Sequence, residues 1–301
     1  IHSLLTDMAR QVTELARFLG AQGAVIRVAL TRVRGSSPRE AGTEMFVAPA
    51  AVYGTVGGGQ LEHRAIEAAR AMLRDGVLTT AMDVPLGPEI GQCCGGRVDL
   101  RLTRMRASDK RAALDRAQAD AEALPHVYVL GAGHVGRALA QQFQHMPVQC
   151  ILIDTRPEEL ALNTAQVETR LQVLPEADIW QAPAGSAFVV LTHDHALDFL
   201  LTSAALERGD AAYVGMIGSA TKRAKFKSWT RTHCDGQSID GLTCPIGATE
   251  SRDKRPAVIA AFVVAEVMAR LTAETAATAS FCLDSHPLRA DFFGHFDVSR
   301  P

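Results

Sequence analysis

Three glycines directly after a short apolar run at 126–130 could hold the phosphates of a nucleotide. Gly131 suits a tight turn, Gly133 lets backbone amides approach a pyrophosphate, and Gly136 allows the following helix to pack closely on the strand. The N-terminus of that helix, where His134 stands, would face the anion. This spacing between a strand and a helix predicts the phosphate-binding turn of a Rossmann fold.

An acid follows at the position where such folds bind a ribose. Asp154 ends the next apolar run, 23 residues after Gly131, and an acid there hydrogen-bonds a ribose hydroxyl. Arg156 stands two residues further on and leaves the choice between NAD and NADP open. Because a fold does not fix a function, the turn could equally be vestigial or hold another phosphate ligand.

A second loop, at 91–96, places two adjacent thiols between glycines. The thiolate form of Cys93 or Cys94 would be a nucleophile or a soft ligand. Neighbouring side chains of an extended loop point in opposite directions, so we expect one of the two to serve a site. The alternative is that both are small buried apolar residues, as free cysteines usually are.

Two further segments are suited to binding an anion. The stretch 54–62 is a glycine-rich turn from a strand into a helix, and such turns present backbone amides to anions. The stretch 35–39 adds two hydroxyls and the guanidinium of Arg39, a group that pairs well with phosphate. Turn chemistry alone would explain either segment. Together with the loop at 91–96, however, three glycine-rich segments occur close together in the sequence, which favours a polar ligand that carries phosphate. The candidate residues of the turn are Gly57, Gly58, Gly59 and Glu62.

A cluster of His193, Asp194 and His195 follows a strand-like run at 186–192. Two imidazoles and a carboxylate could hold a metal or move a proton. A metal site needs three convergent ligands with supporting partners, however, and consecutive residues point in different directions. We therefore treat a metal centre here as the less favoured alternative.

Strand-like and helical segments alternate from residue 126 onward, which is typical of a parallel sheet with helices on both faces. Before it, apolar spacing predicts a helix at 4–19, short strands and a strand at 97–104. We expect an α/β protein, with an N-terminal mixed α/β domain followed by a Rossmann-type doubly wound parallel sheet domain. The expected strands of the second domain lie at 126–130, 148–153, 170–174, 186–192 and 212–217.

The domain boundary is expected where large apolar residues become scarce. The segment 107–124 is rich in Ala, Asp, Arg and Gln and ends at Pro125. We expect the chain to divide into an N-terminal domain at 1–106, a linker at 107–125, a Rossmann-like domain at 126–272 with a closing helix at 255–271, and a tail of unknown role at 273–301.

Composition excludes several classes of protein. With 301 residues, 47% of them hydrophobic, and a net charge of -2, the chain has the composition of a folded protein and no basic field for nucleic acid or an anionic membrane. Six cysteines are too few for a disulfide scaffold. The first residues show no basic region followed by a long apolar core. We expect a cytoplasmic protein without nucleic-acid or membrane partners.

Taken together, these motifs resemble the XdhC/CoxI family. The resemblance extends over residues 5–272, in order and with consistent spacing. The tail beyond residue 272 lies outside it. The matching segments are Gly35–Arg39, Gly54–Glu62, Gly91–Gly96, Gly131–Gly136, Thr192–His195 and Gly215–Ser219.

The resemblance implies an accessory factor of purine catabolism rather than an enzyme. It implies a chaperone that binds molybdenum cofactor (molybdopterin), protects it during sulfuration and delivers it to apo-xanthine dehydrogenase, with a cysteine desulfurase-type protein as sulfur donor. Cys93 or Cys94 would supply the thiol, Gly57–Gly59 and Glu62 the cradle, and the Rossmann glycines a second nucleotide or pterin site. The family commonly has one cysteine in this loop, so the pair leaves open which of the two acts.

Two alternatives of another class stay open. The first is an NAD(P)-dependent oxidoreductase, in which His134 or His193 would be the acid or base. The second is a metal-dependent hydrolase centred on His193, Asp194 and His195. The oligomeric state is also open, with a homodimer as one alternative.

Overall fold

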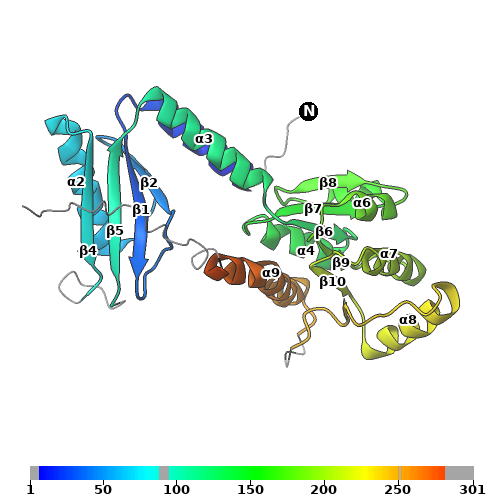
Figure 1. The fold of residues 1–301 in the computed structure, drawn as a ribbon. Coiled ribbons are helices and arrows are strands. Elements are labelled where there is room, and N and C mark those ends of the chain that lie inside the picture. Colours follow the sequence, from blue (N-terminus) through cyan, green and yellow to red (C-terminus); the bar gives the residue numbers. More distant parts are fainter. Residues whose placement is uncertain (1–6, 88–94, 250, 252, 282–301) are drawn as a thin grey trace, which may run out of the picture. The chain divides into compact units, whose positions relative to one another are not determined.

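The computed structural model describes residues 7–87, 95–249, 251 and 253–281 (Figure 1). The described chain forms two compact units, Asp7–Leu124 and the residues from Pro125 onward. We call them the N-terminal unit and the C-terminal unit. Each unit has its own sheet and its own buried core.

The N-terminal unit contains an antiparallel sheet of five strands in the order β3-β2-β1-β5-β4. Helix α2 (Gly59–Asp75) covers one face of this sheet, and its buried residues recur at a spacing of three or four. The other face carries ion pairs such as Arg34 with Asp99, because an antiparallel sheet can leave one face in water. The strands are β1 (Ile26–Arg34), β2 (Glu44–Val47), β3 (Val52–Gly54), β4 (Thr79–Pro85) and β5 (Arg97–Arg104).

Helices α1 (Asp7–Ala21) and α3 (Ala107–Glu122) pack on each other within this unit (Figure 1). Lys110 of α3 connects this helix to the end of α1, because its ammonium donates to the carbonyl oxygens of Leu19 and Gln22 at 3.0 and 2.6 Å. The structure thus differs from the linker expected at 107–125. The alanines that made the segment look like a linker are strong helix formers, and Ala113 is small enough to be buried against α1.

The C-terminal unit contains a parallel sheet of six strands in the order β11-β10-β9-β6-β7-β8. The chain starts in the centre at β6, adds β7 and β8 on one side, and then returns to add β9, β10 and β11 on the other. This is the doubly wound order, with its switch point between β6 and β9, and it confirms the expected fold class. The strands are β6 (His126–Leu130), β7 (Gln149–Asp154), β8 (Glu168–Leu171), β9 (Ala187–Val190), β10 (Tyr213–Met216) and β11 (Leu242–Thr243).

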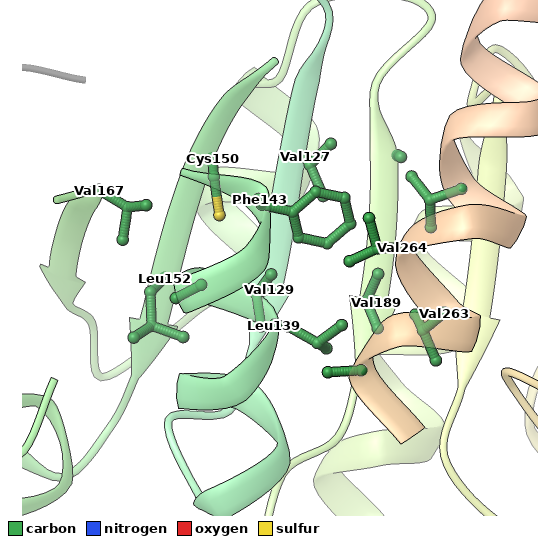
Figure 2. Close-up of a cluster of buried hydrophobic side chains, with 14 of the residues drawn as sticks. Val127, Val129, Leu139, Phe143, Cys150, Leu152, Val167, Val189, Val263 and Val264 are labelled. Atoms are coloured by element: carbon green, nitrogen blue, oxygen red, sulfur yellow. The ribbon is translucent and has the colours of Figure 1, made fainter. Parts of the chain in front are cut away.

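Helices cover both faces of this sheet. Figure 2 shows one face, where Leu139 and Phe143 of α4 (His134–Phe143) pack against valines of the strands and of α9 (Pro256–Phe281). The buried side chains of the strands point alternately to the two faces, which is why the central strands β6 and β9 are almost continuously apolar. The other face is covered by α6 (Glu176–Gln181), α7 (His195–Glu207) and α8 (Ala220–His233), and the short helix α5 (Pro157–Ala161) follows β7.

Helix α9 is a long and strongly apolar helix. Its segment Pro256–Ala273 has a mean hydropathy of 1.7 and is long and apolar enough to cross a membrane by length and composition alone. The core helix of a water-soluble protein passes the same test. Here Ala260, Val263 and Val267 are buried against α4 and the sheet, and 22% of the segment is buried in total.

Candidate functional site

The glycine turn after β6 requires glycine at two positions. Gly131 has φ of +126°, and a Cβ atom there would lie 2.4 Å from the carbonyl oxygen of Leu191. A Cβ atom on Gly136 would lie 1.8 Å from the carbonyl oxygen of Gly131. The first glycine therefore brings β6 and the end of β9 together, and the third brings α4 onto the turn, as the sequence pattern predicts.

Gly133 has a different role, because it is the N-cap residue of α4 and a Cβ atom there would meet nothing within 4 Å. The first turn of α4 carries no acidic side chain, and His134 is exposed. The partial positive charge of this helix end thus has no carboxylate within its first turn to balance it. An anion would be favoured in the open space beside Gly133.

Asp154 ends β7 beside this turn, but its carboxylate already has donors. Oδ2 accepts from the amide of Ala132 at 2.6 Å and from Nη2 of Arg156 at 3.0 Å. Oδ1 accepts from the amide and from Nε of Arg156, at 2.9 and 3.0 Å. Burial alone would raise the pKa of Asp154, but the hydrogen bonds from Arg156 and Ala132 outweigh it and hold the pKa below its usual value. The carboxylate is therefore ionised at neutral pH.

A crevice lies between these groups and the end of β9. It is lined by Gly131, Asp154, Thr155, Pro175, Thr192 and His193, among others. This is the edge of the sheet, at the switch point, where ligands bind in doubly wound folds. The structure therefore brings the glycine turn, Asp154 and His193 to one site.

Two residues support this crevice through a pairing that the sequence does not predict. Asp198, which is fully buried, accepts at Oδ1 from the amide and the hydroxyl of Thr192, at 2.8 and 2.7 Å. Its Oδ2 pairs with the ammonium of Lys222. The only signal in the sequence is a single acid inside the apolar stretch of α7, with no hint of the lysine that would pair with it.

The residues proposed for a metal centre do not converge. His193, Asp194 and His195 are all exposed, and Asp194 caps α7 by accepting from the amide of Ala196 at 2.7 Å. Within the described residues, no group of three or more His, Cys, Asp or Glu side chains could hold a metal ion. The geometry does not support the metal alternative, because an N-cap turns its side chain toward the helix backbone.

In the N-terminal unit, the glycine-rich segments meet at one end of the sheet. A Cβ atom on Gly57 would lie 2.6 Å from Cγ of Pro38, and one on Gly96 would lie 2.0 Å from the carbonyl oxygen of Ser36. A Cβ atom on Gly35 would lie 3.3 Å from the Cα atom of Gly96. Segments separated by up to 61 residues of sequence are thus in close contact. Cys93 and Cys94 lie outside the described residues, and so does the start of their loop at Gly91.

In the glycine turn before α2, amides that were expected to bind an anion already donate to another group of the chain. The carboxylate of Glu62 reaches back to accept from the amides of Val56 and Gly58, at 3.3 and 3.2 Å, and from the hydroxyl of Thr55. The amide of Gly57 donates to the same hydroxyl at 3.2 Å. The donors expected to hold a phosphate therefore hold a carboxylate of the chain itself, whereas the amide of Gly59 has no such bond to Glu62.

Arg39 lies beside this turn. Its side chain is exposed, and its Cγ atom would lie 3.8 Å from a Cβ atom on Gly57. Its amide donates to the hydroxyl of Ser37 at 3.4 Å, which shapes the loop. The stem of the Arg39 side chain therefore lies beside the glycine turn, and among the described residues no hydrogen bond or ion pair joins Arg39 to Glu62.

Each of the two units matches the model of a known protein family. The model described as the XdhC Rossmann domain matches residues 127–267, and the model described as the XdhC and CoxI family matches residues 19–81. The chain belongs to the XdhC and CoxI family. Its XdhC Rossmann match begins in β6 and ends within α9, so it includes the whole parallel sheet, and the XdhC and CoxI match includes the turn with Gly57 and Glu62.

One solved structure shares the fold of this XdhC and CoxI chain. It is described as a xanthine dehydrogenase from Bacillus halodurans, is 15% identical, and gives a TM-score of 0.74. The match covers 91% of this chain and 99% of that one. At this identity the likeness concerns the fold alone. Comparison with curated proteins finds no match.

Proposed function

We propose that this chain is a chaperone that binds molybdenum cofactor, protects it during sulfuration and delivers it to apo-xanthine dehydrogenase in the cytoplasm, as a step of purine catabolism. The observation that carries the proposal is the meeting of three glycine-rich segments at one end of the N-terminal sheet. Gly96, which ends the loop of Cys93 and Cys94, packs on the Gly35–Arg39 loop, and that loop packs on Gly57. Gly96, the described end of this loop, is thereby in contact with the loop that carries Arg39.

The residues present fit this cofactor in part. A pterin dithiolene with a phosphate group needs a soft ligand for its metal and a cation for its phosphate, and when bound it supplies the molybdenum centre that the dehydrogenase requires. Cys93 or Cys94 would be the soft ligand, and Arg39 would pair with the phosphate. The amides of Val56 and Gly58 do not fit a phosphate while Glu62 accepts their hydrogen bonds. We therefore assign Glu62 to shaping the turn.

The chain suits a carrier better than an enzyme of purine oxidation. Its sequence has six cysteines and no set with the spacing that iron–sulfur clusters use. Two of the six, Cys150 and Cys244, are buried and belong to the core. The solved structure of shared fold is described as a xanthine dehydrogenase, and we propose that this chain acts on such an enzyme, with a cysteine desulfurase-type protein as sulfur donor.

Transfer of the cofactor tests the proposal. Purified apo-dehydrogenase is mixed either with this protein loaded with sulfurated cofactor or with the same amount of free cofactor. We expect more dehydrogenase activity from the loaded protein, because a dithiolene and a terminal sulfido group are shielded until transfer. Equal activity from the loaded protein and from free cofactor would contradict the chaperone function and favour the NAD(P)-dependent oxidoreductase instead.

Single replacements identify the thiol. We expect one of Cys93→Ser and Cys94→Ser to weaken cofactor retention and the other to have little effect, because serine is a poor soft ligand. Cys234→Ser is the matched control, since Cys234 is half-buried at the end of α8 and lies in the other unit. Retention by a Cys93→Ser and Cys94→Ser double variant as tight as in the parent would refute the thiol role.

A further inference from the structure

A carboxylate recognises the two hydroxyls of a ribose only with acceptor sites that no other donor uses. An ionised carboxylate offers about four such sites, two on each oxygen. In Asp154 each oxygen already accepts two hydrogen bonds, three of the four from Arg156 and one from Ala132. The carboxylate that should bind a ribose in a Rossmann crevice is therefore saturated by the protein.

Arg156 is held firmly in this position. Its side chain is 27% exposed, and its Nη1 lies 3.8 Å from Oε1 of Glu159. Glu159 also pairs with Arg137, which donates to the carbonyl oxygen of Ala132 at 2.6 Å. The guanidinium thus belongs to a closed network of two acids and two arginines that ends on the glycine turn itself.

A second arginine occurs in the same local sequence pattern but outside the crevice. Arg255 pairs with Asp253 in the same Asp-x-Arg arrangement, with its amide and its guanidinium both donating to the carboxylate. Its side chain is 79% exposed, so it can leave the carboxylate for water. Arg156, by contrast, would leave a carboxylate that is 3% exposed.

We propose that Arg156 is a specificity-determining residue that closes the ribose position of the Rossmann crevice, so that the crevice excludes NAD and other ligands that present a free ribose diol to Asp154. Neutral hydroxyls would have to replace two charge-assisted hydrogen bonds from a guanidinium. The hydrogen bonds that hydroxyls form with the carboxylate are weaker than the ones they would displace. The inference concerns the crevice alone and does not depend on the chaperone function.

The test is calorimetric titration of the full chain with NAD⁺. We expect Arg156→Ala to bind NAD⁺ at least about tenfold more tightly than the parent, because it frees acceptor sites on Asp154. Arg156→Lys, which keeps the charge but offers fewer fixed donors, should fall between the two and guards against misfolding of the alanine variant. Arg255→Ala is the matched control and should equal the parent.

A second replacement shows whether the gain passes through Asp154. Adding Asp154→Asn to Arg156→Ala should return the affinity for NAD⁺ to the level of the parent. The inference is overturned if the parent binds NAD⁺ as tightly as the Arg156 variants, or if none of the folded variants binds NAD⁺ at all. It is also overturned if the gained affinity survives the asparagine.

Discussion

Lys222 and Asp198 form a buried ion pair beneath the crevice of the Rossmann unit. The second carboxylate oxygen of Asp198 accepts hydrogen bonds from the backbone amide and from the hydroxyl of Thr192. The side chains of the lysine and the acid are 11% and 1% exposed. Lys222 also donates to the carbonyl oxygen of Ile217 at 2.9 Å. One pair thus connects the ends of β9 and β10 with the starts of α7 and α8.

Breaking this pair should destabilise the protein strongly. Lys222→Met leaves a buried carboxylate without its cation, and we expect a loss of about 3–5 kcal/mol in the free energy of unfolding. Lys225→Met, on the exposed side of the same helix, should change it by less than about 0.5 kcal/mol. Urea denaturation of the purified variants measures both. Equal midpoints would show that the pair contributes nothing.

Glu62 should stabilise the turn before α2. Glu62→Gln removes the charge that accepts from Val56, Gly58 and Thr55, and we expect a loss of about 1–3 kcal/mol in unfolding free energy. Glu67→Gln is the matched control, because Glu67 is exposed on the same helix. If the two variants melt at the same temperature, the hydrogen bonds of Glu62 do not support the turn.

The two glycines of the Rossmann turn should respond in opposite ways. Gly133→Val places its Cβ atom in open space, so the fold should persist while an anionic ligand at the start of α4 is lost. Gly136→Ala places a Cβ atom against the carbonyl oxygen of Gly131 and should destabilise the unit by several kcal/mol, as overpacking does. Circular dichroism and ligand titration separate the outcomes. Unchanged ligand affinity of Gly133→Val would show that the turn binds no anion.

Asp154 should contribute to stability above pH 4 and lose that contribution in acid. Its pKa in the folded protein is lower than in the unfolded chain, where an aspartate titrates near about 3.9. The stabilisation is therefore complete above the unfolded pKa and disappears as the pH falls through the folded pKa. Unfolding free energies measured from pH 6 to pH 2 should decline less steeply in Asp154→Asn than in the parent. Parallel curves would contradict the assignment.

Much of the fold could be predicted from local pattern. The strand at 97–104 agrees with β5 at both ends, and the strand at 126–130 agrees with β6, because alternating or continuous apolar runs depend on local burial. The sequence does not predict strand β4, since Thr79–Pro85 is an edge strand whose residues alternate between exposed and half-buried and carry a weak apolar signal. The sequence predicts a linker where helix α3 lies, because the packing of this helix uses alanine rather than large apolar residues.

The glycine turn and the doubly wound fold can be predicted from sequence spacing alone. The need for glycine at Gly131 and Gly136 comes from backbone geometry within a few residues of each, and such geometry leaves a readable spacing. Which polar groups have acceptor or donor sites left for a ligand depends instead on contacts between distant parts of the chain. The pairing of Asp198 with Lys222 joins residues 24 positions apart, and the amide of Ala132 reaches Asp154 over 22 positions. Hydrogen bonds of this kind depend on how strands and helices are placed in space, which no local spacing records.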